Sequence, residues 1–483
     1  MKEITNSILK GSARDEESQL EILLPDEKKF HDAAKVGNVD TLEDCLARNV
    51  QINIRTELDR TALHFAVANQ HENAVSFLLN HNARVDIKDK HGMDAFLLAA
   101  WFGHLNILNL LVEKGVDRKS TNEKGKMPYH LAAEGGHLEM VETLRKLDYN
   151  TQKKDKEGNT ALHLAAWNGH VTVLTVLLSE WDLINEQNEE GETAFYLAAA
   201  GGHHECVTLL LGAGSDINIL PKSNMSPLHV AAERGDHSLA LVLIDAGADC
   251  NSQNKRKESP LHLAVKYQHM SIAQLFVESM CNVNILDERN QNPLHLAAEL
   301  GKADLVELLL KANTDLKQRD KQGKTPLGVA ARVNHIIIAD MIIKAERYYA
   351  WKEVIEDRHP IPTSNYPLTF KPDHTTQTSQ LRTTLWTLAH HDLKPKDWKR
   401  LANQWYFTEE QIKGIEEQWT GAKSYKERGH RVLLIWLHGI LLTGTNPVKA
   451  LYEALVNIEQ NNLAEKIRKE INGIPSSQKC TVS

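Results

Sequence analysis

The sequence predicts an all-α protein in two parts, a solenoid of paired short helices followed by a small helical bundle. The motif TALHLAAWNGH at residues 160–170 returns in nearly the same form every 33 residues, for example as SPLHLAVKYQH at 259–269. Between these motifs, apolar residues recur at the i, i+3 and i+4 spacing of amphipathic helices. After residue 378 the helical spacing continues, while the 33-residue period stops.

The repeated part contains ten units with no insertion between them and covers residues 26–350. One alanine occupies the same place in every unit, as at Ala66 and Ala165. Because a small side chain lets two helices approach closely, this position predicts tight packing between neighbouring units. A Gly-His or Gly-Asp pair, such as residues 136–137, divides a unit into two short helices, and a turn such as residues 155–158 precedes the motif.

A period of 33 residues with T-P-L-H-x-A opening the first helix resembles the ankyrin repeat, and the resemblance covers residues 28 to 350. It implies a solenoid of helical pairs with short hairpin fingers, in which each repeat contacts only its neighbours. The first unit, KKFHDAAKVGN, has lysines in place of the usual opening. This composition suits an end cap whose outer face meets water.

Three segments are predicted to be irregular. Residues 1–25 precede the first unit and are expected to be mobile, and residues 474–483 are expected to form a flexible tail. Residues 351–378 hold four of the fourteen prolines. Because proline removes a backbone donor and disfavours helix in the residue before it, this segment is predicted to be an extended linker.

The remaining part, residues 379–473, predicts a compact bundle of six short helices. LRTTLWTLAHH and DWKRLANQW form the first two, and Thr408 with Gln411 makes a capping box that opens TEEQIKGIEEQW. KERGHRVLLIWLHGILL reads as a buried helix. Asn446 and Pro447 start PVKALYEALVNI, and NLAEKIRKEI ends the series.

The order of these features resembles the death domain. The matching stretches are Asp397-Trp398-Lys399 with Leu401-Ala402, Glu410 with Ile412–Glu416, Leu433-Leu434 with Trp436-Leu437, Ala450–Leu455, and Leu463-Ala464-Glu465. The chain departs from the family at WYF, residues 405–407, where a leucine-glycine link is usual, and in the long TGAKSYKERGHR before the fourth helix. Ten ankyrin units followed by one death domain resemble the ankyrin repeat and death domain-containing protein family.

The many histidines invite a search for catalytic or metal sites. Seven units carry histidine at the fourth place of the motif, as at His163, and seven at the eleventh, as at His170; together these places explain fourteen of the 24 histidines. No carboxylate or thiol accompanies them at ligand spacing, so we expect them to tie neighbouring repeats together. The phosphate-loop, dinucleotide-binding, zinc-protease and serine-hydrolase motifs are also missing. The sequence therefore predicts no catalytic residue, no metal and no cofactor.

Bulk properties narrow the partners and the compartment. A net charge of −8 gives no reason to expect binding to nucleic acid. The longest apolar run, VLLIWL, is far shorter than the roughly 20 residues of a membrane span. The first residues lack the apolar segment of a secretory signal, and the five cysteines are scattered. Isolated thiols of this kind indicate a reducing compartment, so we expect a cytoplasmic location.

The resemblance to ankyrin arrays implies that the residues just after the shared alanines face the concave groove, where a client protein would bind. Aromatic side chains at such positions are typical anchors, although packing over the neighbouring helix is an equal alternative for the tryptophans. Charged finger residues of opposite sign add patches that orient a partner. The candidates are Trp101, Phe102, Trp167, Arg234 and Tyr267 in the groove, and Glu189, Glu190, Lys255, Arg256 and Lys257 in the fingers.

Charge differs between the two parts. Residues 379–473 hold 14 Lys and Arg against 11 Asp and Glu, a balance of +3, which leaves −11 for the rest of the chain. The resemblance implies that the bundle, like other death domains, assembles through complementary charged faces. Its basic side chains are therefore candidate contacts for other death domains. For each of these side chains, ordinary solvated charge is the alternative. A second hypothesis is contact between the two oppositely charged parts of this chain, which would mask the bundle. The candidate contacts are Lys396, Lys399, Arg400, Lys423, Lys426, Arg428 and Arg431.

The resemblance also implies one modification. Ankyrin arrays as a class are substrates of an asparaginyl hydroxylase that acts on a finger asparagine, often two places after an aspartate. Asn218 follows Asp216 in this way, and Asn251 follows Asp249. Unmodified finger asparagines are the alternative.

Taken together, the sequence predicts a non-catalytic scaffold or adaptor in signal transduction. It would bind a client through the ankyrin concave face and fingers, and other death domains through the bundle. One alternative is a targeting or cytoskeletal adaptor whose bundle only caps the array. Another is an enzyme with an unrecognised site.

Overall fold

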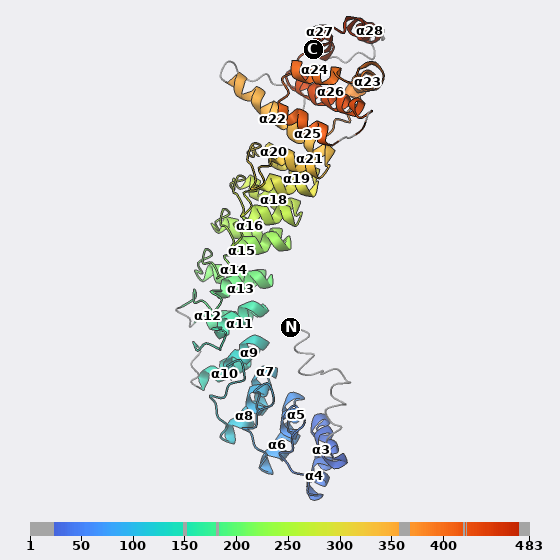
Figure 1. Ribbon diagram of the computed structural model, residues 1–483. Coiled ribbons are helices and arrows are strands. Elements are labelled where there is room, and N and C mark those ends of the chain that lie inside the picture. Colours follow the sequence, from blue (N-terminus) through green and yellow to red (C-terminus); the bar gives the residue numbers. More distant parts are fainter. Residues whose placement is uncertain are drawn as a thin grey trace. The chain divides into compact units, whose positions relative to one another are not determined.

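The computed structural model describes residues 24–147, 152–179, 183–356, 368–418, 421 and 423–472. Every regular element in this part of the chain is a helix, which confirms the all-α prediction (Figure 1). Contacts divide the chain into two compact units, one formed by Met1–Ala231 with Asp245–Ala248 and the other by Ala232–Ile244 with Asp249–Ser483.

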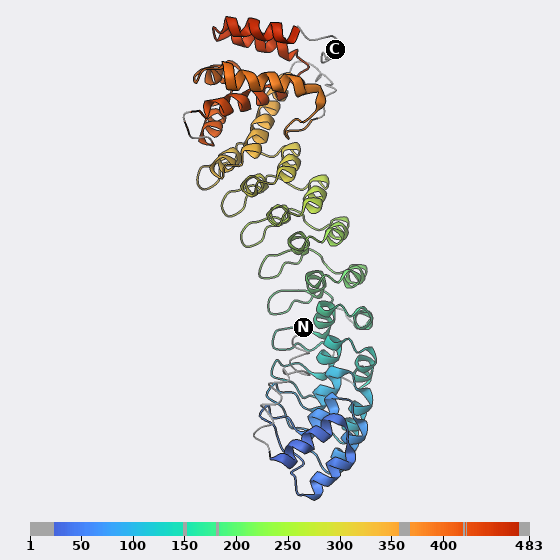
Figure 2. The same ribbon diagram turned by 90° about the vertical axis from the view of Figure 1, so that its right-hand side faces the viewer.

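Paired short helices build the first unit, and each pair corresponds to one predicted repeat. The pairs are α3 (Pro25–Val36) with α4 (Val39–Ala47), α5 (Ala62–Ala68) with α6 (Glu72–Asn80), α7 (Ala95–Phe102) with α8 (Leu105–Glu113), α9 (Pro128–Gly135) with α10 (Leu138–Lys146), α11 (Ala161–Asn168) with α12 (Val171–Leu178), and α13 (Ala194–Gly201) with α14 (His204–Gly212). The first helices of successive pairs pack on one another, and the loops project to one side (Figure 2).

The repeat pattern continues in the second unit, after α15 (Pro227–Arg234) at the division between the units. Its helices are α16 (His237–Asp245), α17 (Pro260–Lys266) with α18 (Met270–Glu278), α19 (Pro293–Leu300) with α20 (Ala303–Lys311), and α21 (Pro326–Arg332) with α22 (Ile336–Glu356).

The motif residues set the bounds of each first helix. In α11, Thr160 is the N-cap in extended conformation, and its hydroxyl lies 2.7 Å from Nδ1 of His163. The helix ends at Gly169, which has a φ of 75° in the left-handed region that glycine adopts readily. The shared alanine of this unit, Ala165, is fully buried, so the predicted close packing of neighbouring first helices is confirmed.

The last repeat differs from the others because its second helix is much longer. α22 has 21 residues and extends past residue 350 into the segment expected to be a linker. Just before residue 350, the rings of Tyr348 and Tyr349 pack against the buried Phe370, with centroids 5.9 and 6.3 Å from the Phe370 centroid. The predicted linker is thus helical at residues 351–356 and packed at residue 370. Residues 357–367, which carry three of its four prolines, lie outside the described part.

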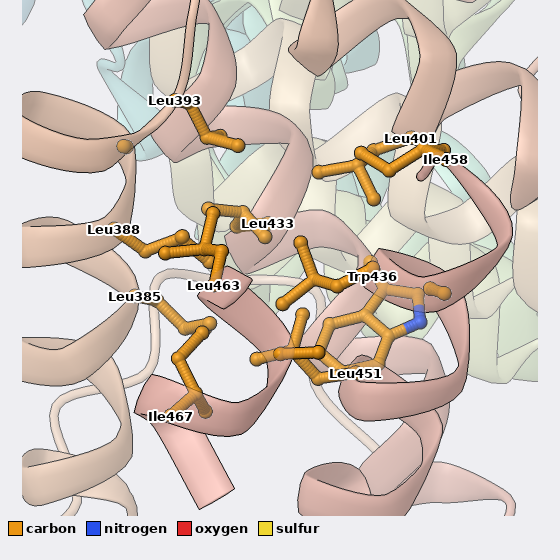
Figure 3. Close-up of a cluster of buried hydrophobic side chains, with 14 of the residues drawn as sticks. Leu385, Leu388, Leu393, Leu401, Leu433, Trp436, Leu451, Ile458, Leu463 and Ile467 are labelled. Carbon is orange, nitrogen blue, oxygen red and sulfur yellow. The ribbon is translucent and has the colours of Figure 1, made fainter. Parts of the chain in front are cut away.

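The bundle consists of the helices expected for residues 379–473, with one π-helical turn at the end of the first. Its helices are α23 (Thr376–Thr387), continued by η1 (Leu388–Asp392), α24 (Asp397–Gln404), α25 (Glu409–Glu417), α26 (Tyr425–Leu442), α27 (Pro447–Asn457) and α28 (Asn461–Asn472). Leu385, Leu433, Trp436, Leu451 and Ile467 meet in a common core (Figure 3). α26 carries the largest share of buried positions, as the apolar run predicts.

Candidate protein-interaction surfaces

The fourth-place histidines are buried, and those such as His163 join the start of their own helix to the next repeat. In His163, Nδ1 accepts a hydrogen bond from the Thr160 backbone N–H at 3.3 Å, and Nε2 donates to the Glu192 carbonyl at 3.2 Å. His64 makes the equivalent bonds in its own repeat. Burial lowers the pKa of His163 to about 4, so the ring is neutral at pH 7 and accepts at one nitrogen while donating at the other.

The eleventh-place histidines reach the preceding repeat. Nε2 of His170 donates to the Glu134 carbonyl at 2.9 Å, and Nε2 of His137 donates to the Trp101 carbonyl at 2.9 Å. A glycine leaves room for each ring, because a Cβ added to Gly136 would lie 2.5 Å from Nδ1 of His170. These bonds confirm that both sets of histidines hold neighbouring repeats together.

The described residues show neither a ligand cluster for a metal ion nor a helix that could cross a bilayer. Within these ranges, no group of three or more His, Cys, Asp and Glu side chains has the arrangement of a metal site. Among the helices of the same ranges, none is both long and apolar enough to cross a bilayer.

The predicted groove residues of the first unit differ in exposure. Trp167 is 43% exposed, whereas Trp101 and Phe102 are half-buried. The carbonyls of both tryptophans accept histidine hydrogen bonds, which fixes the backbone beneath their side chains. Trp167 therefore offers an anchored aromatic surface. The finger residues Glu189 and Glu190 are exposed, as expected.

In the second unit, the groove candidates Arg234 and Tyr267 are also exposed. The Tyr267 hydroxyl donates to a Glu233 carboxylate oxygen at 2.9 Å, and this bond raises the pKa of the phenol. This hydrogen bond fixes the position of the Tyr267 ring, although 43% of the residue is exposed to solvent. The side chains of the finger residues Lys255, Arg256 and Lys257 are exposed.

The two finger asparagines singled out for hydroxylation are exposed. Asn251 is held on both sides, because its N–H donates to Asp249 Oδ1 at 2.9 Å and its Oδ1 accepts from the Asn282 N–H at 2.8 Å. The N–H of Asn218 donates in the same way to Asp216 Oδ1 at 2.9 Å. Asn251 thus links two neighbouring fingers through its side chain, whereas the Asn218 backbone stabilises a turn within one finger.

The basic candidates of the bundle fall into two groups. Lys396 and Lys423 are exposed, and no ion pair of theirs occurs among the described residues. Lys399 pairs with Glu416 at 2.6 Å, and Arg400 lies 3.7 Å from Glu459, so part of their charge is already neutralised.

The other basic candidates lie on or near α26. Lys426 is half-buried. Arg428, also half-buried, donates to the Glu416 carbonyl at 3.2 Å. Arg431 is only 5% exposed, and its guanidinium pairs with Asp340 of α22 at 2.6 Å. The structure therefore places Arg431 in an internal contact and not on a free surface.

Sequence reasoning missed the extent of this contact between the bundle and the last repeat. α25 packs on α21 and α22, and α26 packs on α22, all within the second unit (Figure 1). The only signal was the opposite charge of the two parts, which predicts attraction without identifying residues. Asp340 occupies the place that Glu307 holds in the preceding repeat, so the register of the motif gives no sign of this contact.

Comparison with known families follows the same division of the chain. A family model that describes three copies of the ankyrin repeat matches more than half of the sequence. The matched ranges are residues 30–122, 96–183, 181–254, 229–320 and 261–350. The chain belongs to the ankyrin-repeat family. A death domain model matches residues 382–471, so this ankyrin-repeat protein carries a death domain after its array.

Individual relatives match only parts of this ankyrin-repeat protein. It is 36% identical over 63 residues to a transient-receptor-potential-like protein of Caenorhabditis elegans, which is 12% of this chain and 6% of that protein. The crystal structure of the human ASB11 ankyrin repeat domain is similar with a TM-score of 0.39 and 28% identity, over 42% of this chain and 92% of that chain. The match thus spans a small fraction of this curated relative.

Ankyrin repeats and death domains are both non-catalytic modules that bind other proteins. In this ankyrin-repeat protein the histidines serve contacts between repeats, and aromatic and charged side chains remain exposed beside them. The exposed side chains are therefore available for contacts with protein partners.

Proposed function

We propose that this chain is a non-catalytic, cytoplasmic adaptor in signal transduction. The ankyrin array binds a client protein through its groove and fingers, and the bundle binds other death domains. The observation that supports this proposal most strongly is that, within one repeat, some side chains bond neighbouring repeats while others remain exposed. Buried polar side chains such as His163 satisfy backbone groups, while Trp167, four residues later, has a fixed backbone and an exposed ring.

The client-binding part of the proposal is tested at Trp167. A buried aromatic anchor contributes about 2 kcal/mol or more to binding, so Trp167→Ala should remove a client from the proteins captured by the full chain. Met280→Ala is a matched control, because Met280 is 88% exposed and lies in a turn after α18. Capture from cell extract, quantified by mass spectrometry, should show a client lost with the first variant and kept with the second. Equal capture by both variants would contradict the groove assignment.

The death-domain part is tested at Lys396, which is exposed at the start of α24. Lys396→Glu reverses a charge without breaking an ion pair of the described chain, so the fold should be unaffected. Association with other death domains should weaken, because complementary charge guides such contacts. Lys449→Glu on α27 is the control, since that side chain is 77% exposed and forms a long ion pair with Glu453 on the same helix at 3.9 Å.

A second candidate function is favoured by the contact between bundle and array. A bundle that covers α21 and α22 serves as an end cap, as in a targeting or cytoskeletal adaptor. An unchanged set of partners with Lys396→Glu would favour this cap role. Loss of death-domain proteins from that set would favour signalling.

Hydroxylation of Asn218 or Asn251 by an asparaginyl hydroxylase is a further part of the proposal. Both side chains are exposed in the fingers, where a modifying enzyme has access. Mass spectrometry of protein made with and without the hydroxylase should show a 16-dalton increase on one of the two peptides. Identical masses would remove this part of the proposal.

A further inference from the structure

The face of the death domain formed by the loop before α25, by α25 and by the first half of α26 is covered by the end of the array. We name this face the α25–α26 face and define it by Phe407, Glu410, Gln411, Gly414 and Arg431. Gly414 makes close approach possible, since a Cβ added to it would lie 3.3 Å from Leu327 of α21, and the three nearest atoms all belong to Leu327.

An ion pair lies at the centre of the contact. Nη2 and Nε of Arg431 donate to Asp340 Oδ1 at 2.6 and 2.9 Å. The two side chains are only 6% and 22% exposed, so the pair is largely removed from water. Breaking a buried pair by removing one partner is strongly destabilising, because the other charge is left buried without compensation.

Polar and aromatic contacts surround this ion pair. Gln411 Nε2 donates to Glu346 Oε2 at 2.8 Å, and the Thr325 hydroxyl donates to Glu410 Oε1 at 2.9 Å. The Arg347 guanidinium lies 4.1 Å from the centroid of the Phe407 ring. The contact thus combines a close-packed apolar part with several directional bonds, which is the composition of a specific interface.

The segment that follows α22 adds a second attachment. The Phe370 N–H donates to Glu307 Oε2 of α20 at 3.0 Å, and Lys344 Nζ donates to the Phe370 carbonyl at 3.3 Å. His438 of α26 is bound to the Thr369 carbonyl through Nε2 at 2.7 Å. The chain entering the bundle is therefore held between α20, α22 and α26, which keeps the bundle close to the last repeat.

We infer that the end of the ankyrin array, from Thr325 to Arg347, is an intramolecular partner of the α25–α26 face and makes this face unavailable to a second copy of the chain until the contact opens. This inference rests on the proposed function, because it concerns which face of the death domain reaches other death domains. Docked, the chain presents Lys396 and the exposed sides of α27 and α28. Undocked, it additionally presents Phe407, Arg431 and the surface around Gly414.

Three variants of the full chain test the contact. Asp340→Arg opposes two positive charges, and the swap of Asp340→Arg with Arg431→Asp restores the pair. Gly414→Leu places a side chain where Leu327 lies, and because leucine is favoured over glycine inside a helix, α25 itself should not be weakened. Lys449→Glu is the surface control. Hydrogen exchange of α25 and the first half of α26 reports docking, and exchange of α27 reports whether the bundle is folded.

The inference predicts several-fold faster exchange in α25 with Asp340→Arg and with Gly414→Leu, restored protection in the swap, and no change in α27. It also predicts that the two undocked variants self-associate at lower concentration in sedimentation velocity than the wild type does. Unchanged exchange of α25 in Gly414→Leu would overturn the contact. Faster exchange without any gain in self-association would overturn the occlusion of a second copy, and would leave the proposed binding of other partners intact.

Discussion

Four of the ten repeats, such as the one that holds His64 and His71, carry both histidines, which reach in opposite directions along the array. His64 donates to the Met93 carbonyl of the next repeat at 3.1 Å, and His71 donates to the Lys35 carbonyl of the preceding repeat at 2.9 Å. An imidazole suits this role because its neutral ring has one donor and one acceptor nitrogen. The period of the motif predicted these roles because each bond joins positions that recur in every unit.

Removing one buried ring should therefore cost more than removing an exposed one. His163→Leu leaves the Glu186 and Glu192 carbonyls without their donor, and an unsatisfied buried polar group costs about 1–3 kcal/mol. His81→Leu is the control, because the His81 ring bonds only an exposed carbonyl of its own helix, that of Phe77 at 2.9 Å. Urea unfolding should show a clearly lower midpoint for the first variant. Equal midpoints would contradict the structural role of His163.

Acid should weaken the array through the same rings. Burial lowers the pKa of His64 and of His163 to about 4, below the ordinary value of 6.5. A group whose pKa is lower in the folded state contributes stability above pH 6.5, and this contribution is lost as the pH falls toward 4. The melting temperature should fall between pH 7 and pH 5, and His163→Gln, which cannot titrate, should show a smaller fall. Parallel pH profiles of the two proteins would argue against this linkage.

At the scale of the elements, the turn between the two helices of a pair is crowded at its glycine. Gly103 ends α7 with a φ of 75°, and a Cβ there would lie 2.5 Å from Nδ1 of His137. Gly115 follows α8 with a φ of 77° and has nothing within 4 Å of its Cβ position. The same backbone conformation is thus crowded in one turn and open in the other.

Alanine at these two glycines should separate the two effects. Gly115→Ala should cost only the left-handed strain of about 1–2 kcal/mol. Gly103→Ala should cost that strain plus the displacement of His137 from the Trp101 carbonyl. Chemical unfolding of both variants measures the difference, and a loss no larger for Gly103→Ala than for Gly115→Ala would contradict the crowding argument.

The repeat helices and the bundle helices could be predicted from the sequence because caps, glycine breaks and apolar spacing are local signals. The extension of α22 could not, because its stability depends on Phe370, which packs against it from within the segment predicted to be an extended linker. Arg431 was predicted to be exposed from its charge alone. Its burial depends on Asp340, which is 91 residues earlier in the chain, and no local pattern reports such a pairing.

For the molecule as a whole, the contact between array and death domain should respond to pH through Glu346. Burial raises the pKa of Glu346 to about 7, the Gln411 hydrogen bond opposes this shift, and the neighbouring charges of Glu410 and Lys317 act in opposite directions. A carboxyl with a raised pKa supports docking fully below its ordinary value of 4.5, and this support is lost as the pH rises through 7. Docking should therefore be weaker at pH 8.5 than at pH 6.

Glu346→Gln isolates this effect, because the amide keeps the shape and cannot ionise. Burial lowers the pKa of His430 and of His438, so protonation of these rings should weaken docking as the pH falls below 6.5. Both histidines are present in both proteins. Exchange of α25 at pH 8.5 should be slower in Glu346→Gln than in the wild type, with no difference at pH 5. Faster exchange in the variant at pH 8.5 would contradict the assignment.

At the scale of the whole molecule, the proposed function requires two separate surfaces for protein partners, one on the array and one on the bundle. The most direct measurement is quantitative capture of proteins by the full chain, by Trp167→Ala and by Lys396→Glu, prepared side by side. The account predicts that the two variants lose different proteins, a client in the first case and death-domain proteins in the second. Loss of the same proteins from both variants, or of none from either, would contradict it.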